Sequence, residues 1–273
     1  MINEFVWFRK WLLSGYTVKQ LSEISRKSEN KIHAIINHWL ARRPLFIPDG
    51  LNDVKYSVFD GSFIWKRKVG TIIMLDAERG KLIKGEFDFK ENSPTDLRQF
   101  FSELKQEGLS LKSATIDGNP TVIRVMTEVW PGLIIQRCIV HIQRQGLMWC
   151  RINPKTIEAK KLREIFLALT AVRTQEQKQS FLKAVADWEN HYGKKIESKK
   201  ETGWVFSDLK RARSMLLKAL PNTFHFLDDP RIPRTSNLAE GYFSFMKSRY
   251  RDHRGLSPKK RANFFNWFFI LKP

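Results

Sequence analysis

The apolar residues of the first forty positions recur at helical spacing in three separate runs. Gly15 is expected to end the first helix, and Thr17 and Ser28 are expected to cap the second and the third. A short helix followed by a tight turn and a second amphipathic helix predicts a helix-turn-helix module at residues 1–43. The predicted helices span residues 5–15, 18–25 and 29–40.

The same helices carry a pattern of core and surface positions. Leu21 and Ile24 are expected to form the apolar face of the second helix. Apolar residues recur at core spacing along the third, namely Ile32, Ile35, Ile36 and Trp39. The polar residues of the third helix and its cap suit a surface that reads a DNA groove: Ser28, Glu29, Asn30, Lys31, His33 and Asn37. A three-helix bundle that packs against a partner protein is the alternative.

The stretch ARRPLFIPDG contains two prolines and a glycine, so residues 44–54 are predicted to form a linker. Arg42 and Arg43 at its start either contact DNA phosphate or the minor groove, or are solvated. From residue 55 onward, runs of β-branched and aromatic residues predict strands, and helical patterns separate the later runs. Strands are predicted at 55–65, 70–77, 81–89, 111–118 and 132–140, and helices at 94–108, 120–130 and 141–149.

This order of elements predicts the fold class. Three meander strands followed by alternating helices and strands are typical of an α/β fold with a sheet of mixed direction. The stretch from about 155 to 226 is rich in Lys and in helical patterns, which predicts an all-helical insertion in a domain spanning 55–273. Trp188 lies at core spacing in this insertion, where it either packs in the core or stacks on an unpaired base.

Charge indicates the kind of partner. The formal net charge is +20, from 48 Lys and Arg against 28 Asp and Glu, which favours nucleic acid first and an anionic membrane surface second. No apolar run approaches the roughly 20 residues that cross a bilayer, and FFNWFFI at 264–270 is better explained as a C-terminal core helix. Two cysteines make a disulfide framework unexpected, so a cytoplasmic location and no membrane partner are expected.

Two Asp–Gly pairs and one glutamate are candidates for metal chemistry. Asp60 in SVFDGS and Asp117 in ATIDGN are expected where a strand runs out into a glycine turn, and Glu240 lies near the start of a basic helix. Carboxylate oxygens suit Mg²⁺, and two such ions promote phosphoryl displacement. Alternatively, Asp–Gly is a common turn dipeptide, and Asn237 stands three residues before Glu240 at the spacing of a capping box.

Four motifs in order, VFDGS, TIDGN, IQRCIVHIQRQ and RTSNLAEGYFSFMKSRYRDHRG, resemble the Mutator-like group of DDE transposases over residues 50–260. The resemblance implies an RNase H-like catalytic domain with a helical insertion and an N-terminal DNA-binding region. It also implies that Asp60, Asp117 and Glu240 are the catalytic residues and bind two Mg²⁺ or Mn²⁺ ions. An enzyme of this kind nicks the ends of its element and transfers the freed 3′-hydroxyl to target DNA.

The resemblance further implies partners and supporting residues. The expected ligands are double-stranded DNA of the terminal inverted repeats and of the target, bound by a homodimer or higher oligomer. The family's Cys-x-x-His motif falls on Cys138 and His141, for which shaping of the active site is favoured over zinc, because two ligands do not complete a zinc site. The basic residues after Glu240 are expected to bind phosphate, and these are Lys247, Arg249, Arg251 and Arg254.

One departure from the family and two rival functions stand beside this reading. Many relatives begin with a Cys-rich zinc ribbon, whereas no Cys precedes Cys138, so either the helix-turn-helix takes over that role or the N-terminus is abbreviated. An RNase H-like endonuclease would use the same metal site without strand transfer. A non-catalytic DNA-binding protein derived from a transposase would use the helix-turn-helix alone.

Overall fold

The computed structural model describes residues 2–44, 50–65, 69–198, 204–253 and 255–272. The chain divides into two compact units, one made of Met1–Ser110 with Asn237–Pro273 and the other of Leu111–Ser236. Within the predicted linker, residues 45–49 lie outside the described part of the chain. The domain boundaries drawn from the sequence stay a prediction.

Three helices open the first unit, and their caps are those predicted. Thr17 and Gln20 form a reciprocal capping box, and the Ser28 hydroxyl accepts the backbone N–H of Lys31 at 3.3 Å. Gly15 has φ of +70°, a conformation that L side chains rarely adopt, and it follows the end of the first helix. The helix-turn-helix assignment itself stays a prediction. The helices are α1 (Ile2–Ser14), α2 (Val18–Ser25) and α3 (Glu29–Leu40).

The apolar face of α2 is narrower than expected. Leu21 is fully buried, but Ile24 is 50% exposed, so the prediction that both residues face the core was wrong for Ile24. Because α2 has only eight residues and packs along one stripe centred on Leu21, its last turn projects Ile24 into solvent. On α3 the expected core positions Ile32, Ile35 and Ile36 are buried, and Trp39 is half-buried.

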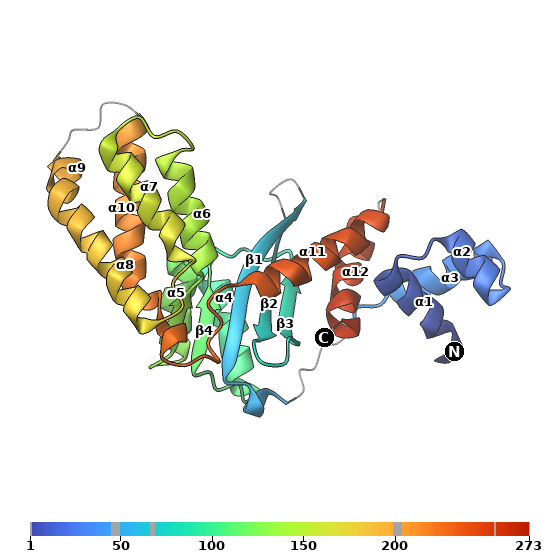
Figure 1. Ribbon diagram of the computed structural model, residues 1–273. Coiled ribbons are helices and arrows are strands. Elements are labelled where there is room, and N and C mark those ends of the chain that lie inside the picture. Colours follow the sequence, from blue (N-terminus) through green and yellow to red (C-terminus); the bar gives the residue numbers. More distant parts are fainter. Residues whose placement is uncertain (1, 45–49, 66–68, 199–203, 254, 273) are drawn as a thin grey trace. The chain divides into compact units, whose positions relative to one another are not determined.

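A hydrophobic core of the first unit joins the N-terminal helices to α12 (Pro258–Leu271). Phe8 and Leu12 of α1 and Phe264 and Phe268 of α12 are all fully buried. Figure 1 shows α12 beside α1 and α3, and contacts between these helices are present. The apolar run near the C-terminus is therefore a core helix, as predicted.

Side chains of α12 also hydrogen-bond the end of α3. Asn263 Nδ2 donates to the Leu40 carbonyl at 2.8 Å, and Trp267 Nε1 donates to the Trp39 carbonyl at 2.9 Å. The last carbonyls of a helix have no partner inside the helix, so these two side chains act as a C-terminal cap from another element.

Three antiparallel strands form the sheet of this unit in the order β3-β2-β1. The register pairs Asp60 with Ile73, and Ile73 with Gly85. Helix α11 (Asn237–Asp252) packs on β1, and the rings of Phe59 and Phe101 join β1 to α4 (Pro94–Gln106). The three strands are β1 (Tyr56–Trp65), β2 (Val69–Asp76) and β3 (Leu82–Phe87).

The second unit begins with a parallel βαβ arrangement. Strands β4 (Ser113–Ile116) and β5 (Ile134–Arg137) pair in parallel and are connected through α5 (Pro120–Val129). The predicted strand over 132–140 was too long, because the chain turns at Cys138 into α6 (Ile139–Cys150). Ile139 and Ile142 both pack into a helical core, and a short apolar run does not distinguish that role from a strand.

Helices make up most of the described residues between 157 and 227, as predicted for the insertion. Their shared core includes Leu162, Phe166 and Trp188, and the Trp188 indole N–H donates to the Glu158 carbonyl at 3.0 Å. Trp188 is therefore a core residue and not a base-stacking platform. The chain as a whole is a mixed α/β protein; the RNase H-like assignment stays a prediction. The helices are α7 (Ile157–Leu169), α8 (Gln175–Trp188), α9 (Lys194–Ser198) and α10 (Trp204–Ala219).

Candidate active site

Asp60 lies inside a strand and not at its end. Strand β1 continues through Trp65, and Asp60 and Gly61 pair with Ile73 and Ile72 of β2, so the expected glycine turn is absent at this position. Pairing with β2 keeps the backbone extended, which a local Asp–Gly signal does not reveal. Asp60 is only 8% exposed, and its Oδ1 accepts the Gly61 N–H at 2.9 Å.

Glu240 and Lys247 share one stripe of α11, because seven residues make almost two full helical turns. Lys247 Nζ donates to the Ser62 hydroxyl at 2.6 Å, and Ser62 lies two residues after Asp60 on the same face of β1. Burial lowers the pKa of Lys247, and the charge of Asp60 partly offsets that effect. The half-buried Glu240 therefore belongs to the stripe of α11 that meets the Asp60 face of β1.

Asp117 follows the last residue of β4, as predicted for a strand-end carboxylate. Its Oδ1 accepts the backbone N–H of Asn119 at 3.0 Å. Gly118 has φ of +107°, and an added Cβ there would lie 1.9 Å from the guanidinium carbon of Arg137. Arg137 donates to the Asp117 carbonyl at 3.3 Å and faces the Asp117 charge, so a cation stands beside this aspartate too.

The structure places Asp60 and Glu240 in the first unit and Asp117 in the second. Among the residues that the structure describes, no group of three or more His, Cys, Asp or Glu side chains is arranged to hold a metal ion. The donor set itself fits a hard cation, since all three predicted ligands offer carboxylate oxygens. Their assignment as metal ligands stays a prediction.

Cys138 and His141 meet a third residue that the sequence did not single out. The Ser236 N–H donates to Cys138 Sγ at 3.2 Å, and the Ser236 hydroxyl lies 3.3 Å from His141 Nδ1. Burial raises the pKa of the Cys138 thiol, but hydrogen bonds from His141 and Ser236 outweigh burial and bring it down to about 7. Thiolate character at neutral pH makes this sulfur a better hydrogen-bond acceptor.

Arg137 and Ser62 were also missed by the sequence analysis. A signal for Arg137 was available, since the parallel register of β4 and β5 pairs it with Ile116, the residue before Asp117. Nothing local in the sequence marks Ser62 as the partner of Lys247, because the contact spans 185 positions. Helix α11 begins at Asn237, which leaves Ser236 as the residue preceding the helix.

The candidate DNA-binding residues of the N-terminal helices lie on the surface. Asn30 and His33 are exposed, as are Ser28, Arg42 and Arg43. Lys31 is exposed as well, but its Nζ pairs with Glu4 at 2.9 Å, so part of its charge is already neutralised. These positions are compatible with DNA contact, which stays a prediction.

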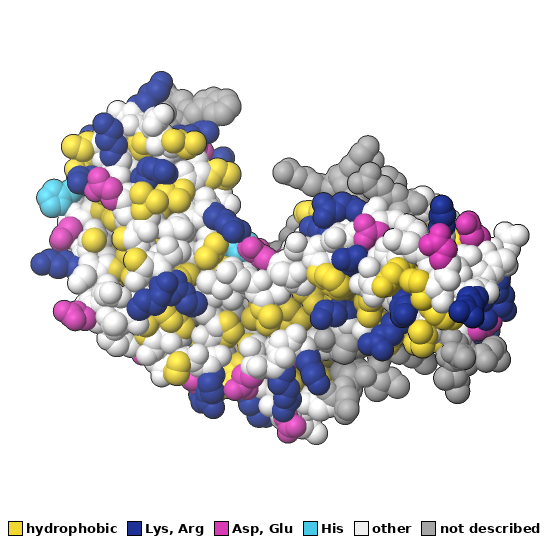
Figure 2. All heavy atoms as spheres, turned by 45° about the vertical axis from the view of Figure 1, so that its right-hand side comes forward, with side chains coloured by type: hydrophobic (Ala, Val, Ile, Leu, Met, Phe, Trp, Pro, Cys, Tyr) yellow, Lys and Arg dark blue, Asp and Glu magenta, His cyan; other side chains and the backbone are white. Residues whose placement is uncertain are grey.

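The basic residues of α11 differ in their availability. Arg251 is exposed, whereas Arg249 is half-buried and pairs with Asp252 at 3.1 Å. Arg254 lies outside the described residues. On the face shown in Figure 2, Lys and Arg side chains are spread over the surface, and Asp and Glu side chains are scattered among them. Of the three described candidates on α11, Arg251 is therefore the one most open to a phosphate.

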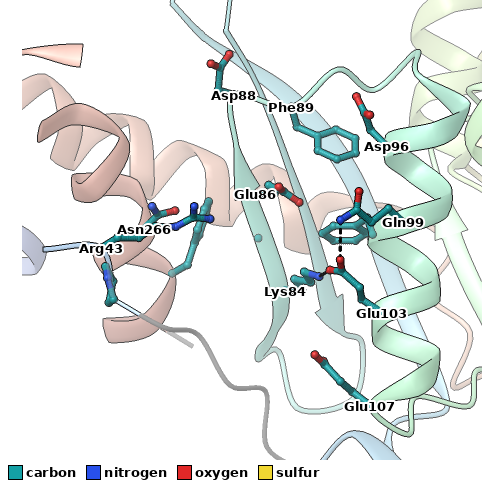
Figure 3. Close-up of a pocket in the computed structure, with 14 residues that line it drawn as sticks. Arg43, Lys84, Glu86, Asp88, Phe89, Asp96, Gln99, Glu103, Glu107 and Asn266 are labelled. Atoms are coloured by element: carbon teal, nitrogen blue, oxygen red, sulfur yellow. Dashed lines mark hydrogen bonds and ion pairs between the residues drawn. The ribbon is translucent and has the colours of Figure 1, made fainter. Parts of the chain in front are cut away.

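A cavity of about 620 Å³ lies in the first unit between β3, α4 and α12. Figure 3 shows Lys84 pointing at Glu103, with which it pairs at 2.5 Å, and Glu86 in the space between β3 and α4. Burial raises the pKa of Glu86, and the nearby Lys84 opposes that shift. Carboxylates dominate the lining, namely Glu86, Asp88, Asp96, Glu103 and Glu107 against Arg43 and Lys84. Such a lining repels phosphate and makes this cavity an unfavourable place for DNA.

The comparisons with known proteins give the family. A family model described as Transposase, Mutator family matches residues 18–217, which is more than half of the chain. The chain therefore belongs to the Mutator family of transposases, and the resemblance seen in its motifs is confirmed. The matched segment contains Asp60, Asp117, Cys138 and His141 and ends before Glu240. No curated protein gives a significant match.

Among the described residues, no helix combines the length and the apolar character that a bilayer crossing requires.

Proposed function

We propose that this protein is a DNA transposase that nicks DNA at the ends of its element and joins the freed 3′-hydroxyl to target DNA. Membership of the Mutator family carries the proposal. The position of Asp60 supports it, because a carboxylate that is held on a paired strand can hold a divalent cation against DNA. Asp60 is 8% exposed and lies on β1, which pairs with β2.

Asp60, Asp117 and Glu240 would hold two Mg²⁺ or Mn²⁺ ions. Bound ions of this kind activate an attacking oxygen and stabilise the leaving oxygen in a phosphoryl displacement. The strand around Asp60 fixes its carboxylate, since β1 is paired with β2 on both sides of that residue. Asn119 fixes the carboxylate of Asp117 through its backbone N–H.

The cations of the chain would then hold the DNA. Arg251, exposed on α11, would bind phosphate, and Lys247 would keep a positive charge beside Asp60. The exposed polar residues of α3 would read the ends of the element, and joining two ends would require at least two copies of the chain. The inverted repeats and the target are both double-stranded DNA.

A cleavage and strand-transfer assay tests the proposal. The substrate is duplex DNA carrying the ends of the element that encodes this chain, incubated with and without Mg²⁺. Asp60→Asn and Glu240→Gln are expected to lower cleavage about 1000-fold or more while leaving DNA binding intact, because they remove anionic ligands and keep side-chain size.

Asp76→Asn is the matched control. Asp76 is a buried aspartate of the same sheet, 3% exposed, whose Oδ1 accepts the backbone N–H groups of Glu78 and Arg79 in a turn. This variant is expected to lose some stability and to keep cleavage. Nicks without joined products would favour an endonuclease, and cleavage that survives in Asp60→Asn would overturn the assignment of the site.

A further inference from the structure

The segment 233–236 is fastened to the second unit at several points. The Thr115 hydroxyl donates to the Pro233 carbonyl at 2.6 Å, and the Ile139 N–H donates to the Arg234 carbonyl at 3.1 Å. Arg234 in turn donates to the carbonyl of Thr170 at 2.7 Å. Strand β4, the start of α6 and the end of α7 therefore all hold this short stretch of chain.

The last residue of the segment is held most completely. Ser236 is fully buried, its N–H is bound by Cys138 Sγ, and its hydroxyl lies beside His141 Nδ1. Cys138 is fully buried as well and directly precedes α6, and His141 lies one helical turn further on. Cys138 and His141, at the start of α6, thus contact the backbone N–H and the hydroxyl of Ser236.

The next residue, Asn237, begins α11, and Glu240 follows four residues after Ser236. We propose that Cys138 and His141 are positioning residues for the reaction: by fixing Ser236 they fix the start of the helix that carries Glu240. The same segment is tied to Thr115, two residues before Asp117. This inference rests on the proposed function, and it gives the Cys-x-x-His pair a role without zinc.

The contacts argue against a zinc site at this position. Cys138 Sγ already accepts a backbone N–H, and His141 Nδ1 already faces a hydroxyl. Within the described residues no third Cys, His, Asp or Glu joins the pair into a metal-binding group. A structural zinc ion needs four ligands, so the arrangement fits hydrogen bonding to Ser236 instead.

Cys138→Ala tests the role, with Cys138→Ser as the conservative variant. Removing the sulfur is expected to raise the Mg²⁺ concentration for half-maximal cleavage about tenfold and to lower kcat about 10- to 100-fold, since partners that orient metal ligands have effects of this size. KM for the DNA ends is expected to stay within about twofold. Cys138→Ser is expected to retain activity within about threefold, because its hydroxyl oxygen can still accept the Ser236 N–H.

Cys150→Ala is the matched control, because Cys150 is the second of the two cysteines, is also buried, and ends the helix that Cys138 precedes. It is 1% exposed and packs in the helical core, where burial raises the pKa of its thiol to about 12. This variant is expected to lower the unfolding midpoint without moving the Mg²⁺ dependence. A general packing effect would make the two alanine variants behave alike, and that result would overturn the proposal.

A second measurement separates this inference from the proposed function. Amide hydrogen exchange of residues 236–241 is expected to become faster in Cys138→Ala and to stay unchanged in Cys150→Ala, whether or not the wild-type protein cuts DNA. If exchange becomes faster in Cys138→Ala but the wild-type protein does not cut DNA, the transposase proposal is overturned and the role of Cys138 and His141 in fixing Ser236 is kept. Unchanged exchange in Cys138→Ala would overturn that role. So would one zinc ion bound per chain in the wild type and lost in Cys138→Ala.

Discussion

Each compact unit contains one of the two candidate Asp–Gly pairs, and the backbone conformation differs between these two pairs. In the first unit, Asp60–Gly61 lies within a paired strand, and the space beside Gly61 is taken by the carboxylate of Glu91. In the second unit, Asp117–Gly118 follows the end of β4, and Gly118 adopts a φ of +107° against Arg137.

The difference shows that one dipeptide can serve two purposes. At Gly61 a substitution affects only the space beside the strand, since a Cβ there would come within 2.3 Å of Glu91 Oε2, the end of a flexible side chain. Gly118 is needed for its backbone conformation as well as for room. Each aspartate also has a neighbouring cation, Lys247 in the first unit and Arg137 in the second.

The largest expected effect comes from lengthening each carboxylate by one methylene. Asp60→Glu is expected to lower the cleavage rate about 1000-fold and Asp117→Glu about 100-fold, because a displacement of 1 Å costs about 100-fold and the buried strand position has less room to adjust. Single-turnover cleavage at saturating Mg²⁺ measures both. If Asp117→Glu lowered the cleavage rate as much as Asp60→Glu or more, the strand interior would not be the more restrictive position, and the comparison would be wrong.

Substitution of the two glycines tests the backbone side of the comparison. Gly118→Ala is expected to cost about 2–3 kcal/mol of unfolding free energy, since it combines a left-handed conformation with a clash against Arg137. Gly61→Ala is expected to cost less than about 1 kcal/mol, because Glu91 can swing away and Gly is itself unfavourable inside a strand.

Urea unfolding followed by circular dichroism measures both glycine variants. Gly132→Ala serves as a reference for conformation without a clash, because Gly132 has φ of +85° and open space around it. If Gly118→Ala and Gly132→Ala lost the same unfolding free energy, the Arg137 side chain would be able to move away from the added Cβ at no measurable cost.

The smallest expected effect concerns pH in the first unit. His253 is 8% exposed, stacks on Trp11 at 3.9 Å and lies 2.8 Å from the Trp11 carbonyl through Nε2. Burial lowers its pKa, although the hydrogen bond to Trp11 and the charge of Asp252 oppose the shift. As pH falls, the His253 imidazole is therefore protonated in the unfolded chain at a higher pH than in the folded protein. The folded state loses stability as pH falls below about 6.5.

His253→Gln removes this titration and keeps a donor for Trp11. Between pH 7 and pH 5, the unfolding free energy of the variant is expected to fall less steeply than that of the wild type, with a difference of at most about 1.4 kcal/mol per pH unit. The exposed His33→Gln is the control and is expected to follow the wild-type slope. Parallel slopes in wild type and His253→Gln would show that this imidazole does not titrate with folding.

Local signals in the sequence were sufficient for much of the fold. Thr17 and Ser28 cap their helices because the capping interaction spans only three residues. The meander strands, the helical insertion and the strand end before Asp117 followed from composition and spacing alone. Each of these features depends on neighbours along the chain, which is why the sequence displays it.

The remaining features depend on distant partners. Strand β1 continues past Asp60 because β2 pairs with it, and Ser236 is held by a cysteine 98 positions earlier. The residues next to Asp60 do not indicate its pairing with β2, and the residues next to Ser236 do not indicate its contact with Cys138. The joint arrangement of Asp60, Asp117 and Glu240 was inferred from the family resemblance and stays a prediction.

The shared core of the N-terminal helices and α12 has a consequence for exchanging specificity between relatives. Because Asn263 and Trp267 cap the end of α3, a chimaera that imports residues 1–40 alone would place foreign helices on a native partner surface. Residues 258–271 would have to be transferred with them, because the surface on which the N-terminal helices pack comes from a segment far later in the chain.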